Sequence, residues 1–124
     1  DKIFGGSGSD IAYGQSGHDR IYLDGGSDWA DGGEGDDLIQ GGGGDDKMFG
    51  GAGSDRIKAG GGRNWVYGGS GDDDLVGGDF KDIIEGGDGD DKITGDGTNR
   101  FYGGAGSDTI EGGRKRDRIL GGPG

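Results

Sequence analysis

The chain has 124 residues, of which 38 are glycine, one is proline and none is cysteine. Such a glycine content is typical of collagen, of disordered chains and of repeat arrays, but glycine does not recur at every third position, which excludes collagen. The missing cysteines exclude a disulfide framework, the short apolar runs exclude a membrane-spanning helix, and the net charge of −12 argues against a nucleic-acid partner.

Aspartate recurs along the whole chain with a period of nine residues. Asparagine replaces it twice, and one step, from Asp91 to Asn99, is eight residues long. The fourteen positions are Asp1, Asp10, Asp19, Asp28, Asp37, Asp46, Asp55, Asn64, Asp73, Asp82, Asp91, Asn99, Asp108 and Asp117. A period that persists through the chain indicates a repeat protein and not a disordered polymer.

An apolar residue stands two positions after each of these fourteen residues. The series is Ile3, Ala12, Ile21, Ala30, Ile39, Met48, Ile57, Val66, Leu75, Ile84, Ile93, Phe101, Ile110 and Ile119. We expect a three-residue strand around each one, starting at 2–4, 11–13 and 20–22, with the central side chain inward and its neighbours outward. Strands this short must stack on neighbouring strands to be stable.

Six-residue turns connect the predicted strands. The full form appears as GGSGSD (5–10), GGEGDD (32–37), GGAGSD (50–55), GGSGDD (68–73), GGDGDD (86–91) and GGAGSD (103–108). We expect the glycines at turn positions one, two and four to adopt positive φ angles, which other residues reach only with strain.

These units resemble the nonapeptide Gly-Gly-x-Gly-x-Asp-x-apolar-x of RTX exoproteins, and the resemblance covers essentially all 124 residues. It implies an all-β fold, a right-handed parallel β-roll in which two repeats form each coil and the strands form two parallel sheets. We expect one array over residues 1–124 whose two ends lie within repeats, as a segment of a larger protein or an engineered array.

Stacking places equivalent aspartates one coil apart, at about the 4.8 Å spacing of adjacent strands. Such a column of carboxylates repels itself unless a cation lies between its members, and Ca²⁺ prefers carboxylate and carbonyl oxygens. The alternative is that the aspartates only cap the turns. We favour calcium binding, and we expect that the chain without calcium is largely unfolded.

The family resemblance also implies the remaining ligands of each ion. They would be the carbonyls of turn positions two and four from one turn, those of positions one and three from the next turn, and both aspartates. The corresponding residues are Gly32, Gly33, Glu34, Gly35, Gly50, Gly51, Ala52, Gly53, Gly68, Gly69, Ser70, Gly71, Gly86, Gly87, Asp88, Gly89, Gly103 and Ala105.

The two edges of such a roll differ. The acidic edge carries the turns that end at Asp1, Asp19, Asp37, Asp55, Asp73, Asp91 and Asp108, and these turns contain no lysine or arginine. The mixed edge carries the turns that end at Asp10, Asp28, Asp46, Asn64, Asp82, Asn99 and Asp117, with Arg63, Lys81, Arg114, Lys115 and Arg116 among them. We expect a continuous calcium row on the acidic edge and at most two sites on the mixed edge, between Asp10, Asp28 and Asp46. The alternative is that the degenerate turns bind calcium through carbonyls alone.

The outward residues of the two predicted sheets also differ. On strands that follow the mixed edge, nine of the fourteen outward residues are large and apolar. They include the aromatic residues Tyr13, Trp29, Phe49, Trp65, Tyr67 and Tyr102. This face could contact a protein domain, a second copy or a carbohydrate, or it could reflect only the preference of aromatic residues for strands.

No catalytic group stands out. His18, the only histidine, lies at an exposed turn position with Ser16 nearby, and paired carboxylates such as Asp36/Asp37 recur on successive turns without a predicted cleft. We expect a calcium-binding module without enzymatic activity. The resemblance implies a secreted, extracellular bacterial protein exported by type I secretion. The alternatives are an adhesive or self-associating module, or an accessory polysaccharide-binding module.

Overall fold

The computed structural model describes all 124 residues and contains fourteen β-strands and no α-helix, so no helix could cross a membrane. The strands are β1 (Lys2–Ser7), β2 (Ile11–Ser16), β3 (Arg20–Gly25), β4 (Trp29–Glu34), β5 (Leu38–Gly43), β6 (Lys47–Ala52), β7 (Arg56–Gly61), β8 (Trp65–Ser70), β9 (Asp74–Val76), β10 (Ile83–Asp88), β11 (Lys92–Thr94), β12 (Arg100–Ala105), β13 (Thr109–Glu111) and β14 (Arg118–Leu120).

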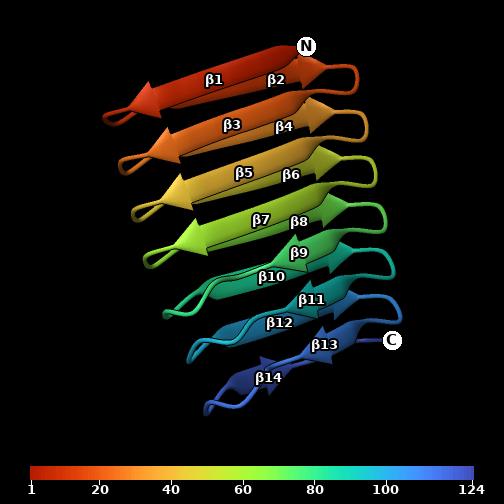
Figure 1. Cartoon of the computed structure of the whole chain (residues 1–124). Helices are drawn as coiled ribbons and strands as arrows, with labels where there is room; N and C mark the ends of the chain where they lie inside the picture. The colour runs from red at the N-terminus through yellow and green to blue at the C-terminus, as the bar shows by residue number, and fades with distance from the viewer.

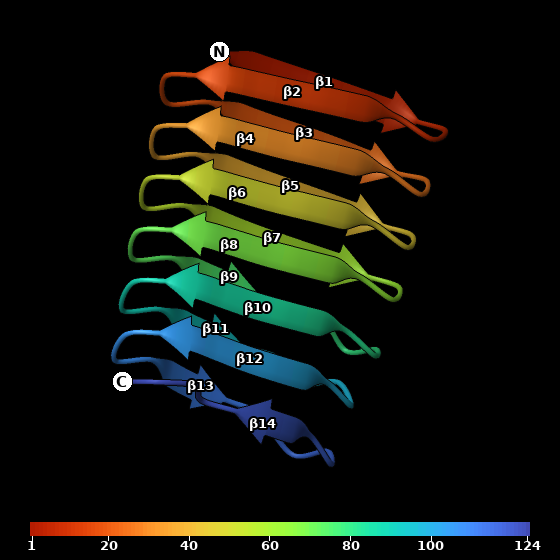
Figure 2. The same ribbon diagram turned by 180° about the vertical axis from the view of Figure 1, so that it is seen from behind.

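The strands form two seven-stranded parallel sheets that stack coil upon coil. The odd-strand sheet runs β1-β3-β5-β7-β9-β11-β13, and the even-strand sheet runs β2 to β14 in the same order. The chain passes along one sheet, turns back along the other and descends by one strand, which makes a right-handed solenoid (Figures 1 and 2). The predicted right-handed parallel β-roll with two repeats per coil is therefore confirmed.

The register between coils follows the sequence period. Ile21 pairs with Ile39, eighteen residues later, and Ile39 pairs with Ile57. After the eight-residue step the pairing distance becomes seventeen, as in Ile84 with Phe101 and Ile93 with Ile110. The missing residue is absorbed in the turn at 95–99, so every strand keeps its inward side chain in line.

Ten of the fourteen strands are six residues long, so the prediction of three-residue strands is wrong for them. In each of the ten, the first three turn residues continue the ladder; Gly33, for example, pairs with both Gln15 and Gly51. All ten turns that follow have positive φ at positions two and four, which are glycines except at Gln15 and Asp24. The turns at 77–82 and 95–99 have no positive φ, and the strands before them stay short.

The glycine at turn position one has a different role from the one predicted, because its φ is not positive. A Cβ atom at Gly32 would collide with the Asp37 carboxylate and with the carbonyl oxygen of Gly50 in the next coil. This glycine is therefore required for space and not for backbone conformation.

The core consists of two facing columns of inward side chains, one from each sheet. Eleven of the fourteen predicted inward residues are buried, and Ile3 and Ile110 pack against them. Ile119 is 49 % exposed, which contradicts the prediction; it lies in the last coil, where no further coil covers it. The core also contains Leu23 and Ala59, which replace the glycine at turn position one.

The glycines at turn position two predict the effect of a substitution on stability. Gly51 has a φ of 116°, and an added Cβ would collide with the carbonyl oxygen of Gly33. We expect Gly51→Ala to destabilise the roll by about 1–2 kcal/mol or more. Thermal unfolding of the folded protein measures the change. The matched control is Gly43→Ala, where φ is not positive and no atom lies within 4 Å of the added Cβ; equal melting temperatures for the two variants would contradict this explanation.

Candidate metal centres in the turns

The position-six residues form a hydrogen-bonded column along each edge. The backbone N–H of Asp19 donates to Oδ1 of Asp37 in the next coil at 2.8 Å, and Asp37 and Asp55 repeat this bond to Asp55 and Asp73. On the mixed edge, Asn64 and Asn99 join the same column through Oδ1. From Asp19 and Asp28 onward, each carboxylate in the two columns therefore has one oxygen that accepts a bond from the preceding coil.

The second carboxylate oxygen is buried and has no hydrogen-bond partner in most of these residues. The unpaired Oδ2 atoms belong to Asp10, Asp19, Asp28, Asp37, Asp46, Asp55, Asp73 and Asp91. A buried charged oxygen without a partner is strongly unfavourable. A repeat of eight such atoms at one turn position indicates that a ligand outside the protein satisfies them.

Burial and repulsion make these carboxylates hard to ionise in the ion-free fold. Burial is the main cause that raises the pKa of Asp55 to about 6 and that of Asp73 to about 7. The hydrogen bond from the preceding coil opposes this increase, and nearby carboxylates add to it: Asp37 for Asp55, and both Asp55 and Asp91 for Asp73. The pKa values of Asp37, Asp46 and Asp91 are also raised, again mainly by burial.

The unpaired oxygens point toward backbone carbonyls. Asp37 Oδ2 and the Gly50 carbonyl oxygen approach the same point inside the turn. A Cβ atom added to Gly32 would occupy that point and collide with both oxygens. The carbonyls of Gln15 and Gly17 face Gly33 and Gly35 of the next turn in the same way. The predicted carboxylate and carbonyl ligands thus lie together between consecutive turns.

The donor set consists of oxygen atoms only. No group of three or more acidic or histidine side chains could enclose an ion by itself, so most ligands of any ion would be carbonyls. Position-three carbonyls, such as that of Glu34, already accept a bond from the preceding coil, here from Gly17 N at 2.8 Å; a carbonyl oxygen has a second lone pair. Such a set suits a hard cation, Ca²⁺ above others, and not a softer metal.

The mixed edge changes after Asp46. The amide nitrogen of Asn64 donates to the carbonyls of Gly61 at 3.5 Å and Gly62 at 3.4 Å, within its own turn. Asp82 Oδ2 accepts a bond from Gly78 N at 2.8 Å. These turns satisfy their polar groups internally, whereas Asp10, Asp28 and Asp46 keep unpaired Oδ2 atoms.

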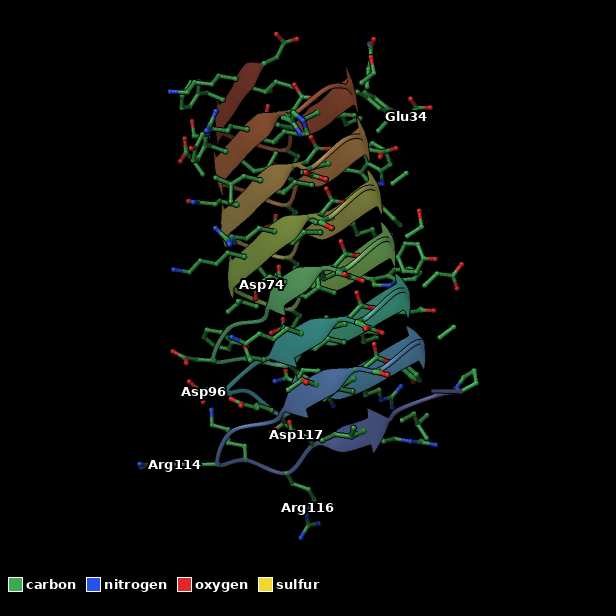
Figure 3. The ribbon with its side chains drawn as sticks, turned by 90° about the vertical axis from the view of Figure 1, so that its right-hand side faces the viewer. Glu34, Asp74, Asp96, Arg114, Arg116 and Asp117 are labelled. Carbon is green, nitrogen blue, oxygen red and sulfur yellow. The ribbon has the colours of Figure 1, made fainter.

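A basic side chain also contacts one of these turns. Lys115 Nζ donates to the carbonyl oxygen of Asp79 at 3.0 Å, two coils away. Arg114 and Arg116 in the same turn point away from the roll (Figure 3). The ammonium group of Lys115 thus places positive charge on a turn carbonyl of the mixed edge, whereas the turns of the acidic edge contain no lysine or arginine.

Position five of the turns forms a second column, which the sequence analysis did not assign. Oδ1 of Asp36 accepts a bond from Ser54 N at 2.8 Å, and Asp90 Oδ1 accepts one from Ser107 N. His18 holds the same place, with Nδ1 accepting a bond from Asp36 N at 2.9 Å. The doubled aspartates at positions five and six, such as Asp36 and Asp37, were the sequence signal for this second column. The position-six aspartate faces the interior of the turn, and the position-five aspartate caps the next turn from outside.

The aromatic residues of the even-strand sheet form a stripe of contacting rings. Ring centroids are 4.9 Å apart for Tyr13 and Trp29, 5.6 Å for Trp29 and Phe49, and 6.4 Å from Phe49 to both Trp65 and Tyr67. Glu85 separates Tyr67 from the sixth predicted residue, Tyr102, which makes no ring contact. Five of the six residues therefore form one surface.

Comparison with known proteins agrees with the repeat structure. The model of a family described as RTX calcium-binding nonapeptide repeat (4 copies) matches residues 1–30, 24–57, 49–84, 67–101, 76–109 and 102–124. These overlapping matches span the chain from end to end. No curated protein and no solved structure matches it.

The raised pKa values predict how pH affects the ion-free chain. The pKa values of Asp55 and Asp73 in the folded state, about 6 and about 7, exceed the unfolded value of about 3.9. Ionisation therefore opposes folding at pH 8, and protonation relieves this cost as pH falls from about 7 toward 4. We expect protein dialysed against metal-free buffer to gain β-sheet signal in circular dichroism between pH 8 and pH 5. An ion-free chain that is equally or less ordered at pH 5 contradicts this expectation.

Proposed function

Because the chain belongs to the family of RTX calcium-binding nonapeptide repeats, we propose that it binds several calcium ions in a row and folds when it binds them. The observation that carries this proposal is the series of buried, unpaired Oδ2 atoms at turn position six. A divalent cation between two such oxygens would convert mutual repulsion into attraction.

The ions would lie mainly along the acidic edge. There, Asp19, Asp37, Asp55, Asp73 and Asp91 have unpaired Oδ2 atoms in five consecutive coils. Asp1 and Asp108 would complete the row; the side chain of Asp108 accepts the bond from Asp91 N, and the amino group of Asp1 bonds to Asp19 Oδ1. The carbonyls of turn positions one to four would supply the other ligands, as the family resemblance implies.

The mixed edge would bind at most two ions, between Asp10 and Asp28 and between Asp28 and Asp46. These three residues have unpaired oxygens, whereas the turns at Asn64 and Asp82 satisfy theirs with backbone groups. An ion near Asn64 would have to displace the amide nitrogen from the carbonyls that it contacts.

Calcium binding would act as a folding switch. Without ions, folding must bury a column of like charges or protonate them, and glycine-rich chains lose more conformational entropy than most. A ligand that binds only the folded state shifts the equilibrium toward it. The binding free energy of several ions would thus stabilise a roll whose core contains only 13 buried residues.

This switch suits export from a bacterial cell. RTX repeats are typical of secreted bacterial proteins, and extracellular calcium modules have dissociation constants of about 10⁻⁴–10⁻³ M. Such sites would be empty in the cytosol and filled outside the cell. We propose that the module crosses a type I secretion channel unfolded, folds extracellularly and has a structural role without catalysis.

The direct experiment is a calcium titration of the metal-free protein near neutral pH. Far-UV circular dichroism and the hydrodynamic radius should both change cooperatively, from an expanded chain to a compact β-structure. Magnesium at the same concentration is the control, because its preference for near-ideal octahedral geometry does not suit carbonyl-rich turns. A full β-sheet spectrum and a compact radius in the metal-free protein would disprove calcium-driven folding.

Two isosteric substitutions test where the ions bind. Asp73→Asn should remove the binding of at least one ion, because it replaces an unpaired oxygen on the acidic edge. Asn64→Asp should create binding for one or two further ions, because it completes a column of Asp46, residue 64 and Asp82 on the mixed edge. Equilibrium dialysis with calcium counts the ions per chain. Equal stoichiometry in both variants and the parent protein would contradict the difference between the edges.

A second candidate function, self-association, is supported by the continuous aromatic stripe from Tyr13 to Tyr67. Exposed apolar surfaces of this kind are typical of contact sites. Light scattering of the Trp29→Ser/Trp65→Ser variant in calcium should show a smaller mass than the parent protein. A parent protein that is already monomeric would remove this candidate.

A further inference from the structure

The basic residues of the chain are not distributed evenly around the roll. Five of the thirteen lie on the odd-strand sheet, and none lies on the acidic edge. The remaining eight lie on the mixed edge or on the even-strand sheet, between the fifth repeat and the last. They are Lys47, Arg63, Lys81, Arg100, Arg114, Lys115, Arg116 and Arg118. One corner of an otherwise acidic protein therefore carries most of its positive charge.

A groove of about 390 Å³ lies at this corner, where the mixed edge meets the even-strand sheet. Four basic side chains line it together with two apolar ones, and all six are exposed. These residues are Lys47, Arg63, Trp65, Lys81, Ile83 and Arg100. Trp65 is 45 % exposed and Ile83 is 38 % exposed, so the groove combines positive charge with an accessible apolar surface.

Acidic residues do not neutralise this groove. Three aspartates also line it, but Asp46 and Asp82 are buried. In both residues, one carboxylate oxygen accepts a hydrogen bond from a backbone N–H of the preceding coil. Only Asp45 is exposed, and its Oδ1 accepts a bond from Arg63 N. Four basic side chains therefore face one exposed carboxylate.

The corresponding corner on the acidic edge has no such character. A groove of about 400 Å³ lies there too, but Arg20 and Arg56 are offset by Asp36, Asp72 and Asp74, with Arg56 paired to Asp74 at 3.5 Å. No tryptophan, tyrosine or phenylalanine lines it. The basic, aromatic groove is thus specific to the mixed edge and does not follow from the repeat itself.

The groove runs along the axis of the solenoid. Lys47, Trp65, Ile83 and Arg100 are paired neighbours on four successive strands, β6, β8, β10 and β12. Arg63 and Lys81 occupy position five of two successive turns. Each step corresponds to about 4.8 Å, the spacing of adjacent strands. A matching ligand is linear and carries negative charges at intervals of about one coil.

We infer that this groove binds a linear acidic polysaccharide, with its carboxylate or sulfate groups on Arg63, Lys81 and Arg100 and a sugar ring against Trp65. One sugar unit of such a polymer is comparable in length to one coil step. Arginine binds carboxylate and sulfate through paired N–H groups, and the aromatic ring of tryptophan offers a flat apolar surface with a polar edge to the ring of a sugar.

Other polyanions fit the groove less well. An acidic peptide in extended form is recognised mainly through backbone bonds at a free strand edge, and β8 and β10 are paired on both sides. A nucleic acid is wide enough to bring its phosphates near the acidic remainder of this protein, whose net charge is −12. A flat membrane surface does not match a groove that follows the axis of the roll.

Binding assays on the calcium-saturated chain test this inference. The probes are galacturonic acid oligomers too short to gel with calcium, dextran sulfate and neutral dextran. Isothermal titration calorimetry should show binding of one or both acidic probes, no binding of neutral dextran, and weaker binding at high salt. The two acidic probes distinguish carboxylated from sulfated polymers.

Matched variants locate the site. Arg63→Gln/Lys81→Gln should weaken binding at least tenfold, and Trp65→Thr should weaken it several-fold. Lys58→Gln/Lys92→Gln makes the same change in charge on the odd-strand sheet and should leave the affinity unchanged. Circular dichroism in calcium verifies that each variant is folded, which separates loss of the groove from failure of calcium-driven folding.

Three results would overturn the inference. The first is the absence of binding to both acidic probes. The second is equal affinity of the groove variants and the control variant, which would place the polymer elsewhere, for example on calcium at the acidic edge. The third is tighter binding of poly-glutamate or of phosphatidylglycerol vesicles than of either polysaccharide, which would assign the groove to a peptide or to a membrane.

Discussion

The structure depends on columns of aspartates in which most carboxylates have one oxygen that accepts a hydrogen bond and one buried oxygen without a partner. The backbone of the preceding coil donates to Oδ1, and this bond fixes the side chain so that Oδ2 points into the turn. The same bond that sets the register between coils therefore brings like charges together. We propose that a cation outside the polypeptide satisfies those oxygens and so stabilises the stacking of the coils near neutral pH.

Much of the fold could be predicted from the sequence because each repeat contacts mainly its neighbours. The nine-residue period predicts the two sheets, the inward residues from Ala12 to Phe101 and the assignment of each aspartate to one edge. Three features could not be predicted, because they depend on contacts between coils. They are the extension of strands into turns, the crowding of Cβ at position one, and the capping by Asp36 of the turn at Ser54.

The sequence indicates the kind of candidate site but not its detailed geometry. The aspartates and glycine-rich turns indicate calcium, yet the contrast between Asp73, with an unpaired oxygen, and Asn64, which bonds to its own turn, emerges only from the structure. The basic groove was not predicted from the sequence, because Arg63 and Lys81 were considered only as residues that disfavour calcium binding at the mixed edge. In the sequence, Lys47, Trp65 and Arg100 are far apart, and only the stacking of coils makes them neighbours. We thus propose calcium binding at one edge of the roll and polysaccharide binding at the opposite corner.

The central claim concerns where cations lie relative to the turns. The most direct measurement is an anomalous difference map from crystals grown in calcium, with data collected at a wavelength where calcium scatters anomalously. The account predicts a row of peaks between successive turns of the acidic edge, each beside the Oδ2 atoms of residues such as Asp55 and Asp73, and no peak beside Asn64 or Asn99. Peaks only at the outer carboxylates of Asp36, Asp72 and Asp90, or an ordered roll without peaks at the acidic edge, would contradict it.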